Sequence, residues 1–370
     1  MNFLISKKTF FDSLSHFQSI VEKRNTIPIL SNIKLTTDNN FLKISATDLS
    51  IQLSEKIEAK INTEGQVTVP SQMLFDIIRK APEKSEIEVR ENNQTGKIFL
   101  FFNSTKFSLP YLPAADYPEI DVEESLCEFV IEGAKLKFLV DNCKFSMGTD
   151  ESRPYLNGVY MHASDNNSEI ITVATDGHRL SKCFIKVETH MPNFKGVIIP
   201  KKAVNEVSKL LDHNDSAIKI KVSKNKILFD VGKISLISKL VNANFPDYES
   251  VIPKNNNLEV VCDTNSFSET IDRVSTISAE KFRTVKLEIE ANKCTVSSFG
   301  EEKSAGTEKI DVAYDGKIIN INFNARYLLE VLSIIKSEKI KINFAEGTAP
   351  TVLQGVSEKN SVYLIMQMRA

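Results

Sequence analysis

Ala174-Thr175-Asp176-Gly177-His178-Arg179-Leu180 opens with a tripeptide that also occurs at Ala46-Thr47-Asp48, 128 residues earlier in the chain. In both places the tripeptide ends an alternating stretch that predicts a β-strand, Leu42–Thr47 in one case and Ile170–Thr175 in the other. A tripeptide match alone is weak. The segments around it match in the same order, however, and this indicates an internal repeat.

The repeat has three copies with the same order of predicted elements. Each copy begins with a short apolar strand and an amphipathic helix, and the helices are predicted at 7–23, 134–145 and 265–277. Alternating strands follow, then a second helix, predicted at 70–80, 200–211 and 324–335, and a closing pair of strands. The copies run over 1–121, 122–252 and 253–370, which we interpret as three domains. Two helices on antiparallel strands in each copy indicate the α+β class, with one sheet expected per copy.

Composition excludes several classes of protein. The chain has 370 residues, of which 42% are apolar and 25% charged, an ordinary globular composition. Its 46 basic and 48 acidic residues give a net charge of −2, so it is not a generally cationic nucleic-acid binder. Neither a membrane-spanning apolar run nor a signal peptide is predicted. The five cysteines are widely spaced without a C-x-x-C pair, so we expect a reducing cytoplasm.

Known motifs for cofactor and metal chemistry are also missing from the sequence. No glycines form G-x-G-x-x-G, no glycine begins G-K-[ST], and no histidines form H-x-x-x-H. We therefore expect no cofactor, no metal site and no catalytic residues. Binding without chemistry becomes the leading hypothesis.

Three units in a row either stack openly or close into a ring, and two chains would supply six units. Twelve helices side by side would surround a hole of roughly 28 Å, which is wide enough for duplex DNA. Basic residues exceed acidic ones by six in the segments that contain the predicted helices, although the whole chain is acidic. These segments are 7–24, 70–80, 132–147, 200–212, 265–283 and 323–339. This pattern favours a hole that contacts phosphates without reading bases. The alternative is that helices simply favour lysine.

Several motifs across the whole chain resemble one family, the bacterial DNA polymerase III β subunit or sliding clamp. They are Thr26-Ile27-Pro28-Ile29-Leu30, Leu112-Pro113-Ala114-Ala115-Asp116, Tyr155-Leu156-Asn157-Gly158, Ala174–Leu180, Phe245-Pro246-Asp247-Tyr248 and Met366-Gln367-Met368-Arg369. The resemblance implies a head-to-tail homodimeric ring around duplex DNA, without enzymatic activity or cofactor. It also implies a clamp loader, the DNA polymerase III catalytic subunit, and other polymerases or repair proteins as partners, and no membrane.

The resemblance further implies a pocket for short partner peptides between the second and third domains. Its expected residues are Leu156, Thr175, Gly177, His178, Arg179, Leu180, Pro246, Val251, Asn324, Tyr327, Val352, Met366, Met368 and Arg369. Leu, Val, Pro and Met supply an adaptable apolar surface, and the two arginines can hold acceptor groups of a peptide. Gln367 replaces a proline usual in the family, and Ser250 stands where a basic residue is common, so the peptide preference stays open.

Duplex-contacting residues implied by the resemblance are Arg24, Arg153, Tyr155, Lys201 and Lys202. Pro154 stands where the family often has an aromatic side chain, so stacking is not expected there. The implied dimer contact joins the edge strand with Phe107 and Leu109 to Thr276 and Ile277 of the partner. Covering such an edge also prevents stray strand pairing.

Two alternatives from other classes remain at this point. A monomeric triplicated adaptor would bind peptides without encircling DNA. A hydrolase would use Asp176 and His178 as general acid and base, although the motif contains neither a nucleophile nor a metal partner. Sedimentation separates the first alternative from a dimer, since a ring would have twice the 41.6 kDa mass of one chain.

Overall fold

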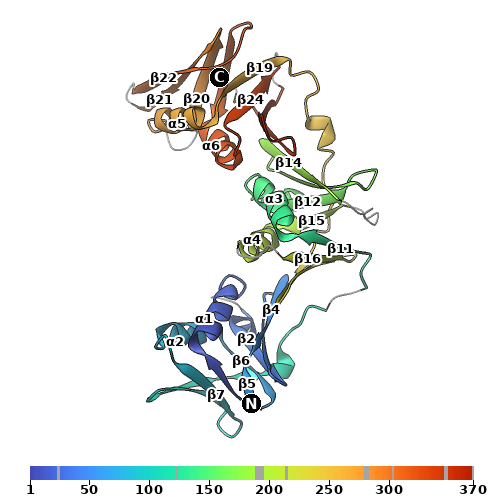
Figure 1. Cartoon of the computed structure of the whole chain (residues 1–370), viewed down its shortest axis with the longest axis vertical. Coiled ribbons are helices and arrows are strands. Elements are labelled where there is room, and N and C mark those ends of the chain that lie inside the picture. The colour runs from blue at the N-terminus through green and yellow to red at the C-terminus, as the bar shows by residue number, and fades with distance from the viewer. Residues whose placement is uncertain are drawn as a thin grey trace. The chain divides into compact units, whose positions relative to one another are not determined.

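The computed structural model describes residues 1–22, 26–121, 124–187, 196–212, 216–278, 283–301, 304–345 and 349–368. Within these residues the chain forms six α-helices among antiparallel β-strands, which confirms the α+β prediction (Figure 1). The helices are α1 (Lys7–His16), α2 (Ser71–Lys80), α3 (Gly133–Lys144), α4 (Lys201–Leu210), α5 (Thr264–Ser275) and α6 (Ala325–Ile334). Two of them fall within each predicted copy, as expected.

Helix α5 shows why these segments are helical. Phe267 and Ile271 are buried at helical spacing, and the Asp263 carboxylate accepts a backbone N–H of the first turn at 2.7 Å. Side chains of Ser6 and Asn324 cap α1 and α6 in the same way. Local sequence therefore specifies where these helices begin.

The first predicted helix, 7–23, was too long. Helix α1 ends at His16, where the Phe17 N–H turns back to the carbonyls of Leu14 and Ser15. Phe17 and Ile20 nevertheless stay fully buried, because they pack into the core from a turn. The apolar spacing thus continued beyond the helix and extended the prediction.

Contacts divide the chain into two compact units. Unit 1 comprises Met1–Ala134 and Asn205–Leu240, and unit 2 comprises Lys135–Val204 and Val241–Ala370. Short 3-10 turns also occur: η1 (Pro28–Ser31) and η2 (Ala114–Asp116) in unit 1, and η3 (Pro154–Leu156) and η4 (Glu249–Val251) in unit 2.

Unit 1 contains two antiparallel sheets. The larger has the order β10 (Leu112–Pro113), β6 (Gly65–Pro70), β2 (Asn32–Asp38), β3 (Phe41–Thr47), β4 (Ile51–Glu58), β18 (Ile234–Lys239), β17 (Lys226–Val231), β16 (Ala217–Val222), β11 (Cys127–Glu132). The smaller has the order β5 (Lys60–Thr63), β1 (Asn2–Ser6), β7 (Glu86–Asn92), β8 (Lys97–Phe102), β9 (Thr105–Pro110). Strand β9 is therefore an edge strand of its sheet.

Unit 2 also contains two antiparallel sheets. The larger has the order β15 (Val197–Pro200), β12 (Gly158–Ala163), β13 (Glu169–Thr175), β14 (Arg179–Lys186), β26 (Ser361–Ile365), β25 (Thr351–Gly355), β24 (Lys339–Phe344), β19 (Leu258–Asp263). The smaller has the order β22 (Ala305–Asp311), β21 (Lys293–Phe299), β20 (Thr284–Glu290), β23 (Ile319–Asn324). Strand β22 is therefore an edge strand of its sheet.

The expectation of one sheet per copy was wrong. Strands β11 and β16–β18 of the second copy belong to the nine-stranded sheet, whereas β12–β15 belong to the eight-stranded sheet. Each of the two larger sheets continues from one copy into the next, where β4 pairs with β18 and where β14 pairs with β26. The alternation of side chains along a strand is the same whichever strand lies next to it. The sequence pattern therefore does not show that strands of different copies pair.

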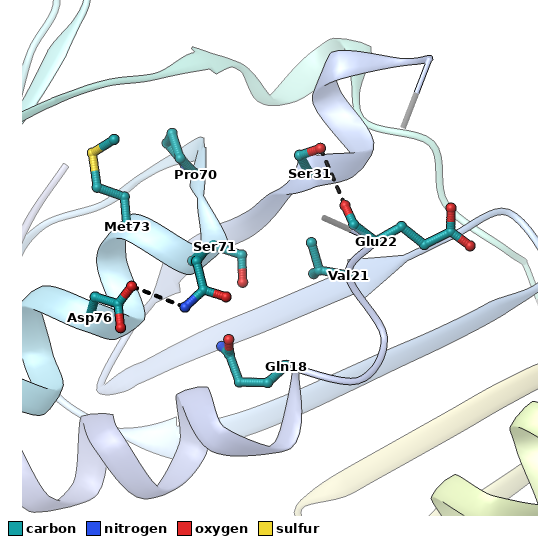
Figure 2. Close-up of a pocket in the computed structure, with 9 residues that line it drawn as sticks. Gln18, Val21, Glu22, Ser31, Pro70, Ser71, Met73 and Asp76 are labelled. Carbon is teal, nitrogen blue, oxygen red and sulfur yellow. Dashed lines mark hydrogen bonds between the residues drawn. The ribbon is translucent and has the colours of Figure 1, made fainter. Parts of the chain in front are cut away.

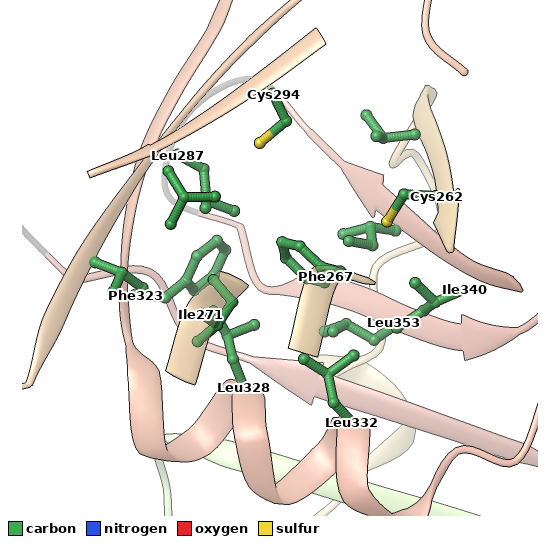
Figure 3. Close-up of a cluster of buried hydrophobic side chains, with 14 of the residues drawn as sticks. Cys262, Phe267, Ile271, Leu287, Cys294, Phe323, Leu328, Leu332, Ile340 and Leu353 are labelled. Carbon is green, nitrogen blue, oxygen red and sulfur yellow. The ribbon is translucent and has the colours of Figure 1, made fainter. Parts of the chain in front are cut away.

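The core of the third copy lies between its two helices and the strands of both unit 2 sheets (Figure 3). Phe267 and Ile271 of α5 and Leu328 of α6 point into this space. Cys262 and Cys294 are buried in the same core, and burial raises the pKa of each thiol to about 12. These cysteines therefore act as small apolar side chains and stay unreactive.

Candidate functional site

The turn between β13 and β14 is held by two side chains of the repeated tripeptide. Thr175 Oγ1 donates to the Arg179 carbonyl at 2.6 Å and accepts the Gly177 N–H at 3.1 Å. Asp176 Oδ1 accepts the N–H groups of His178 and Arg179 at 2.9 and 3.1 Å. Gly177 has a φ of +91°, a left-handed conformation that glycine adopts without strain.

The first copy builds the same turn with the same bonds. Thr47 Oγ1 donates to the Ile51 carbonyl and accepts the Leu49 N–H, at 2.8 and 3.0 Å. Asp48 Oδ1 accepts the N–H groups of Ser50 and Ile51, both at 2.8 Å. Leu49 takes the left-handed position with a φ of +74°. The tripeptide is therefore repeated because it forms a turn, which weakens the hydrolase alternative.

Arg179 connects this turn to helix α6. Its guanidinium donates to Asp176 Oδ2 at 3.0 Å, to Glu330 Oε2 of α6, and to the Phe145 carbonyl at 2.5 Å. The guanidinium carbon also lies 4.5 Å from the ring centroid of Tyr327. Only 9% of the side chain is exposed. Arg179 thus directs its donor groups to partners within the protein.

A pocket of about 280 Å³ opens beside the turn in unit 2. It is formed by the ends of β14 and β26, by η3 and by the segment around η4. Its lining consists of Tyr155, Leu156, Thr175, Gly177, His178, Arg179, Leu180, Pro246, Asp247, Tyr248, Val251, Pro350, Leu364 and Met366.

The pocket has a buried apolar floor and a more exposed rim. Leu156, Leu180 and Leu364 are buried, and Leu180 pairs with Leu364 across the β14–β26 contact. Val251 and Met366 keep 47% and 38% of their surface exposed. A small cavity with this lining suits one or two apolar side chains of a ligand.

Tyr248 forms a fixed wall of the pocket. Its hydroxyl lies 2.9 Å from Nε2 of His162, whose Nδ1 lies 2.7 Å from the Ala163 carbonyl. Burial lowers the pKa of His162 and raises the pKa of Tyr248, so both are neutral at pH 7. The hydroxyl therefore donates to the imidazole, and Lys182 lies 5.3 Å from the tyrosine ring centroid.

Nine of the predicted peptide-binding residues line this pocket: Leu156, Thr175, Gly177, His178, Arg179, Leu180, Pro246, Val251 and Met366. Four others lie elsewhere. Asn324 caps α6, Val352 packs behind the floor, and Tyr327 supports Arg179 from α6. The Met368 N–H bonds to the Asn322 carbonyl at 2.8 Å in a bridge to β23. Arg369 lies outside the described residues.

Sequence reasoning missed four lining residues and gave another a different role. Asp247 and Tyr248 belong to a quoted motif, so that motif already contained their signal. Leu364 is identified only by its pairing with Leu180, and no pattern marks Pro350. Tyr155 was assigned to DNA, yet it lines the pocket.

The residues assigned to DNA are spread over two elements of unit 2. The Arg153 Nε donates to Asp150 at 2.9 Å just before η3, and Lys201 and Lys202 begin α4. The hydroxyl and N–H of Ser152, together with Arg153, hold the pKa of Asp150 below its usual value. Arg24 lies outside the described residues.

The residues assigned to the dimer contact lie beside open edges. Phe107 and Leu109 belong to edge strand β9, with Phe107 exposed and Leu109 buried. Thr276 and Ile277 follow α5, and a Cβ added at Gly306 of edge strand β22 would lie 3.1 Å from Ile277 Cδ1. Ile277 therefore packs against β22.

Unit 1 contains a second cavity, of about 530 Å³, between the end of α1 and the start of α2 (Figure 2). None of the predicted site residues lines it. Gln18, Glu22 and Asp76 make its lining more polar, and the buried Ser71 hydroxyl has no hydrogen-bond partner in the described structure. The smaller pocket, with its convergent leucines, is the better candidate for apolar anchors.

Metal and membrane sites are not found in the part of the chain that the structure describes. No group of three or more His, Cys, Asp or Glu side chains there is arranged to hold a metal ion. Likewise, no helix in the described ranges is long and apolar enough to cross a membrane.

Comparisons with known proteins match the chain over its full length. Profiles of the DNA polymerase III β subunit match residues 1–121 (N-terminal domain), 130–247 (central domain) and 249–369 (C-terminal domain). The β sliding clamp of Caulobacter vibrioides strain NA1000 / CB15N is 35% identical over 371 residues, covering 100% of both chains. That of Proteus mirabilis is 33% identical over 371 residues, again covering 100% of both.

Solved structures agree with these sequence matches. The sliding clamp of Bartonella birtlesii bound to griselimycin has a TM-score of 0.97 and 34% identity, covering 100% of both chains. The Caulobacter crescentus clamp with bound polyethylene glycol has a TM-score of 0.96 and 34% identity, with the same coverage. Sequence, repeat and fold agree along the entire chain, and the chain belongs to the DNA polymerase III β subunit family, the bacterial sliding clamps.

Proposed function

We propose that the chain is a DNA polymerase processivity factor: two copies close head to tail into a ring that encircles duplex DNA and slides without sequence preference. Family membership over the full length supports this function. The threefold repeat supplies six similar units from two chains. We take these units to be domains 1–121, 122–252 and 253–370. The ring itself needs no catalytic residue or cofactor.

Strand order is the observation that carries ring closure. Strand β4 pairs with β18, and β14 pairs with β26, so the third strand after the first helix of one copy pairs with the last strand of the next. In the third copy, the strand that corresponds to β4 and β14 is β22. In the first copy, the strand that corresponds to β18 and β26 is β9. Both β22 and β9 are edge strands. We therefore propose that β22 of one chain pairs with β9 of its partner, with Phe107 and Leu109 beside Thr276 and Ile277.

Contacts to DNA in this proposal are made to phosphates by Arg24, Arg153, Lys201 and Lys202. Helical segments carry an excess of basic residues within an acidic chain, which supports a cationic inner surface. Binding without a loader is then weak, salt-sensitive and indifferent to sequence. We move Tyr155 from this group to the peptide pocket, because it lines that cavity.

Partners dock through the 280 Å³ pocket, with leucine or phenylalanine side chains of a short peptide on its leucine floor. We propose the polymerase III catalytic subunit, other polymerases, repair proteins and the clamp loader as carriers of such peptides. A micromolar affinity, about −8 kcal/mol, suits an exchange among several partners. Arg179 acts as a positioning residue, since its donors already bond to Asp176, Glu330 and Phe145.

With all five cysteines free and buried, we place the protein in the reducing cytoplasm.

Topology on DNA tests the ring. The protein is loaded onto a nicked circular duplex, and the circle is then linearised by a restriction enzyme. A ring stays on the circle and slides off the linear molecule. Equal retention on both forms contradicts encirclement and favours the monomeric adaptor, as does sedimentation at the mass of one chain.

Two variants test whether pocket and ring surfaces are separate. Leu180→Ala removes packing from the floor and weakens the peptide by roughly 1–3 kcal/mol while the dimer survives. Leu53→Ala is the matched control, an equally buried leucine in unit 1. Ile277→Asp places a charge beside β22 and splits the dimer while isolated chains still bind peptide. A dimeric Ile277→Asp variant, or wild-type affinity for Leu180→Ala, shows that the two surfaces are assigned wrongly.

A further inference from the structure

The outward face of the five-stranded sheet in unit 1 carries two phenylalanines side by side. Along β8 the side chains of Ile98 and Leu100 are buried, whereas Phe99 and Phe101 lie on the opposite face and are partly exposed. Their ring centroids are 6.3 Å apart. Strand alternation thus places two partly exposed aromatic rings next to each other on the same face of the sheet.

Cationic side chains flank both rings. Arg90 of β7 lies 5.3 Å from the centroid of Phe101, and Lys106 of β9 lies 4.4 Å from Phe99 and 5.5 Å from Phe101. The register explains this arrangement, because Arg90 pairs with Phe99 and Lys106 pairs with Phe101 across the sheet. Each cation lies within the distance at which it is attracted to an aromatic face.

The face is also locally basic. Lys97 precedes Phe99 on the same side of β8, and within the described chain neither Lys97 nor Lys106 forms an ion pair with a carboxylate. Arg90 does pair with Glu88 at 2.6 Å, so its charge is partly balanced. A chain with a net charge of −2 thus presents two lysines without carboxylate partners around two partly exposed aromatic rings.

We propose that this face, defined by Phe99, Phe101, Arg90, Lys97 and Lys106, binds single-stranded nucleic acid without sequence preference. Bases stack on the two rings, and the lysines and Arg90 turn from the rings to the phosphates. A duplex has the same phosphates but keeps its base faces enclosed in the helix, so it contacts only the cations. An acidic peptide would satisfy the charges without using both flat rings.

This site differs from the proposed passage of duplex DNA in its ligand and in its residues. It uses base stacking on a sheet, whereas the ring uses phosphate contacts alone. It needs neither loading nor ring closure, so its test is independent of the ring proposal.

Fluorescence anisotropy with fluorescein-labelled (dT)12 at low salt tests the proposal on the full chain. Phe99→Ala and Phe101→Ala each weaken binding about tenfold, since stacking on one ring is lost. Phe41→Ala is the matched control, because Nζ of Lys56 lies 4.3 Å from the ring centroid of Phe41 in another part of unit 1. This variant should bind (dT)12 like the wild type. An abasic 12-mer and a 12-base-pair duplex, which offer phosphates without free base faces, bind at least tenfold more weakly than (dT)12.

A tryptophan probe keeps the test valid if an alanine variant folds poorly. The chain contains no tryptophan, so Phe101→Trp introduces a single emitter at the site. Its fluorescence falls when a base stacks on it, and affinity for (dT)12 is retained. Equal binding of the abasic strand or the duplex overturns the proposal, as does unchanged (dT)12 affinity of the Phe99→Ala/Phe101→Ala double variant. Direct binding of a fluorescein-labelled poly-glutamate peptide, together with no binding of (dT)12, also overturns the proposal and assigns the face to acidic proteins instead.

Discussion

Arg179 gives the sharpest test of the pocket, because positioning the turn and contacting the peptide predict different results. Arg179→Ala removes bonds to Asp176, to Glu330 and to the Phe145 carbonyl. Hydrogen bonds to charged groups contribute about 1.5–3 kcal/mol each. The two carboxylates are 17% and 28% exposed, so water replaces part of the lost interaction. We therefore expect a local loss of about 2–4 kcal/mol.

Hydrogen exchange measures this loss at the affected junction. The Met366 N–H donates to the His178 carbonyl at 2.8 Å, and Leu180 pairs with Leu364, so these amides report opening between β14 and β26. A loss of 2–4 kcal/mol makes them exchange roughly 30- to 700-fold faster. Arg179→Lys is expected to behave almost like Arg179→Ala, since one ammonium cannot reach three separate acceptors.

Arg326→Ala is the matched control, because Arg326 bonds to the same Glu330 at 2.9 Å but is 69% exposed. It should change the opening free energy by less than about 0.5 kcal/mol. Peptide affinity is measured for the same variants. If Arg179→Ala exchanges like wild type while its peptide affinity falls more than tenfold, Arg179 contacts the peptide directly and the positioning role is wrong.

Three further predictions concern the two turns and α1. Leu49→Gly relieves the strain of a left-handed leucine at a φ of +74°, so thermal unfolding should show a gain in stability of up to about 1 kcal/mol. A lower unfolding midpoint would show that Leu49 is not strained. Gly177→Ala adds a Cβ at a φ of +91°, 3.3 Å from Arg153 Nη1, and should lower the midpoint, whereas no change would mean that the turn adapts freely. Nδ1 of His16 lies 3.0 Å from Glu55, and this hydrogen bond raises the pKa of His16. The contribution of the bond to the free energy of unfolding is therefore complete below pH 6.5 and is lost at higher pH. His16→Gln should flatten the pH dependence of the free energy of unfolding measured in urea.

Features set by local sequence were predictable. The six helices follow from apolar spacing and end residues, and the Ala-Thr-Asp repeat gives the same turn twice with the same four bonds. The pocket residues that adjoin this turn, such as His178 and Leu180, were implied by the family resemblance of the motif that contains them. They lie next to one another in the chain, so their proximity needed no knowledge of the fold.

Features set by pairing between distant segments were not predictable from one sequence. Leu364 reaches the pocket only because β26 pairs with β14, and Pro350 enters from a loop with no pattern of its own. Glu330 is an ordinary helical glutamate until the fold brings α6 to Arg179. The predicted end of helix α1 was wrong for a related reason. Phe17 continues the helical spacing of apolar residues, but tertiary packing buries it from a turn after the helix has ended.

The two copies of the turn show how the same local structure lies beside a pocket in one copy and beside a packed junction in another. In both copies the turn starts a strand, β4 or β14, that pairs with the last strand of the next copy. Ile51 follows the first turn and is buried, whereas Arg179 follows the second turn and is bonded to Glu330 of α6. The Thr and Asp side chains that hold the turn are thus the same in both copies. The residues after them decide whether the strand pair, β4–β18 or β14–β26, is closed by packing or lines a pocket. Gln52 in place of Leu180 removes the leucine of the floor, so the first junction lacks the apolar anchor point even though its turn is intact. The shared residues therefore account for the turn, and the residues that differ between the copies account for the pocket beside the second turn.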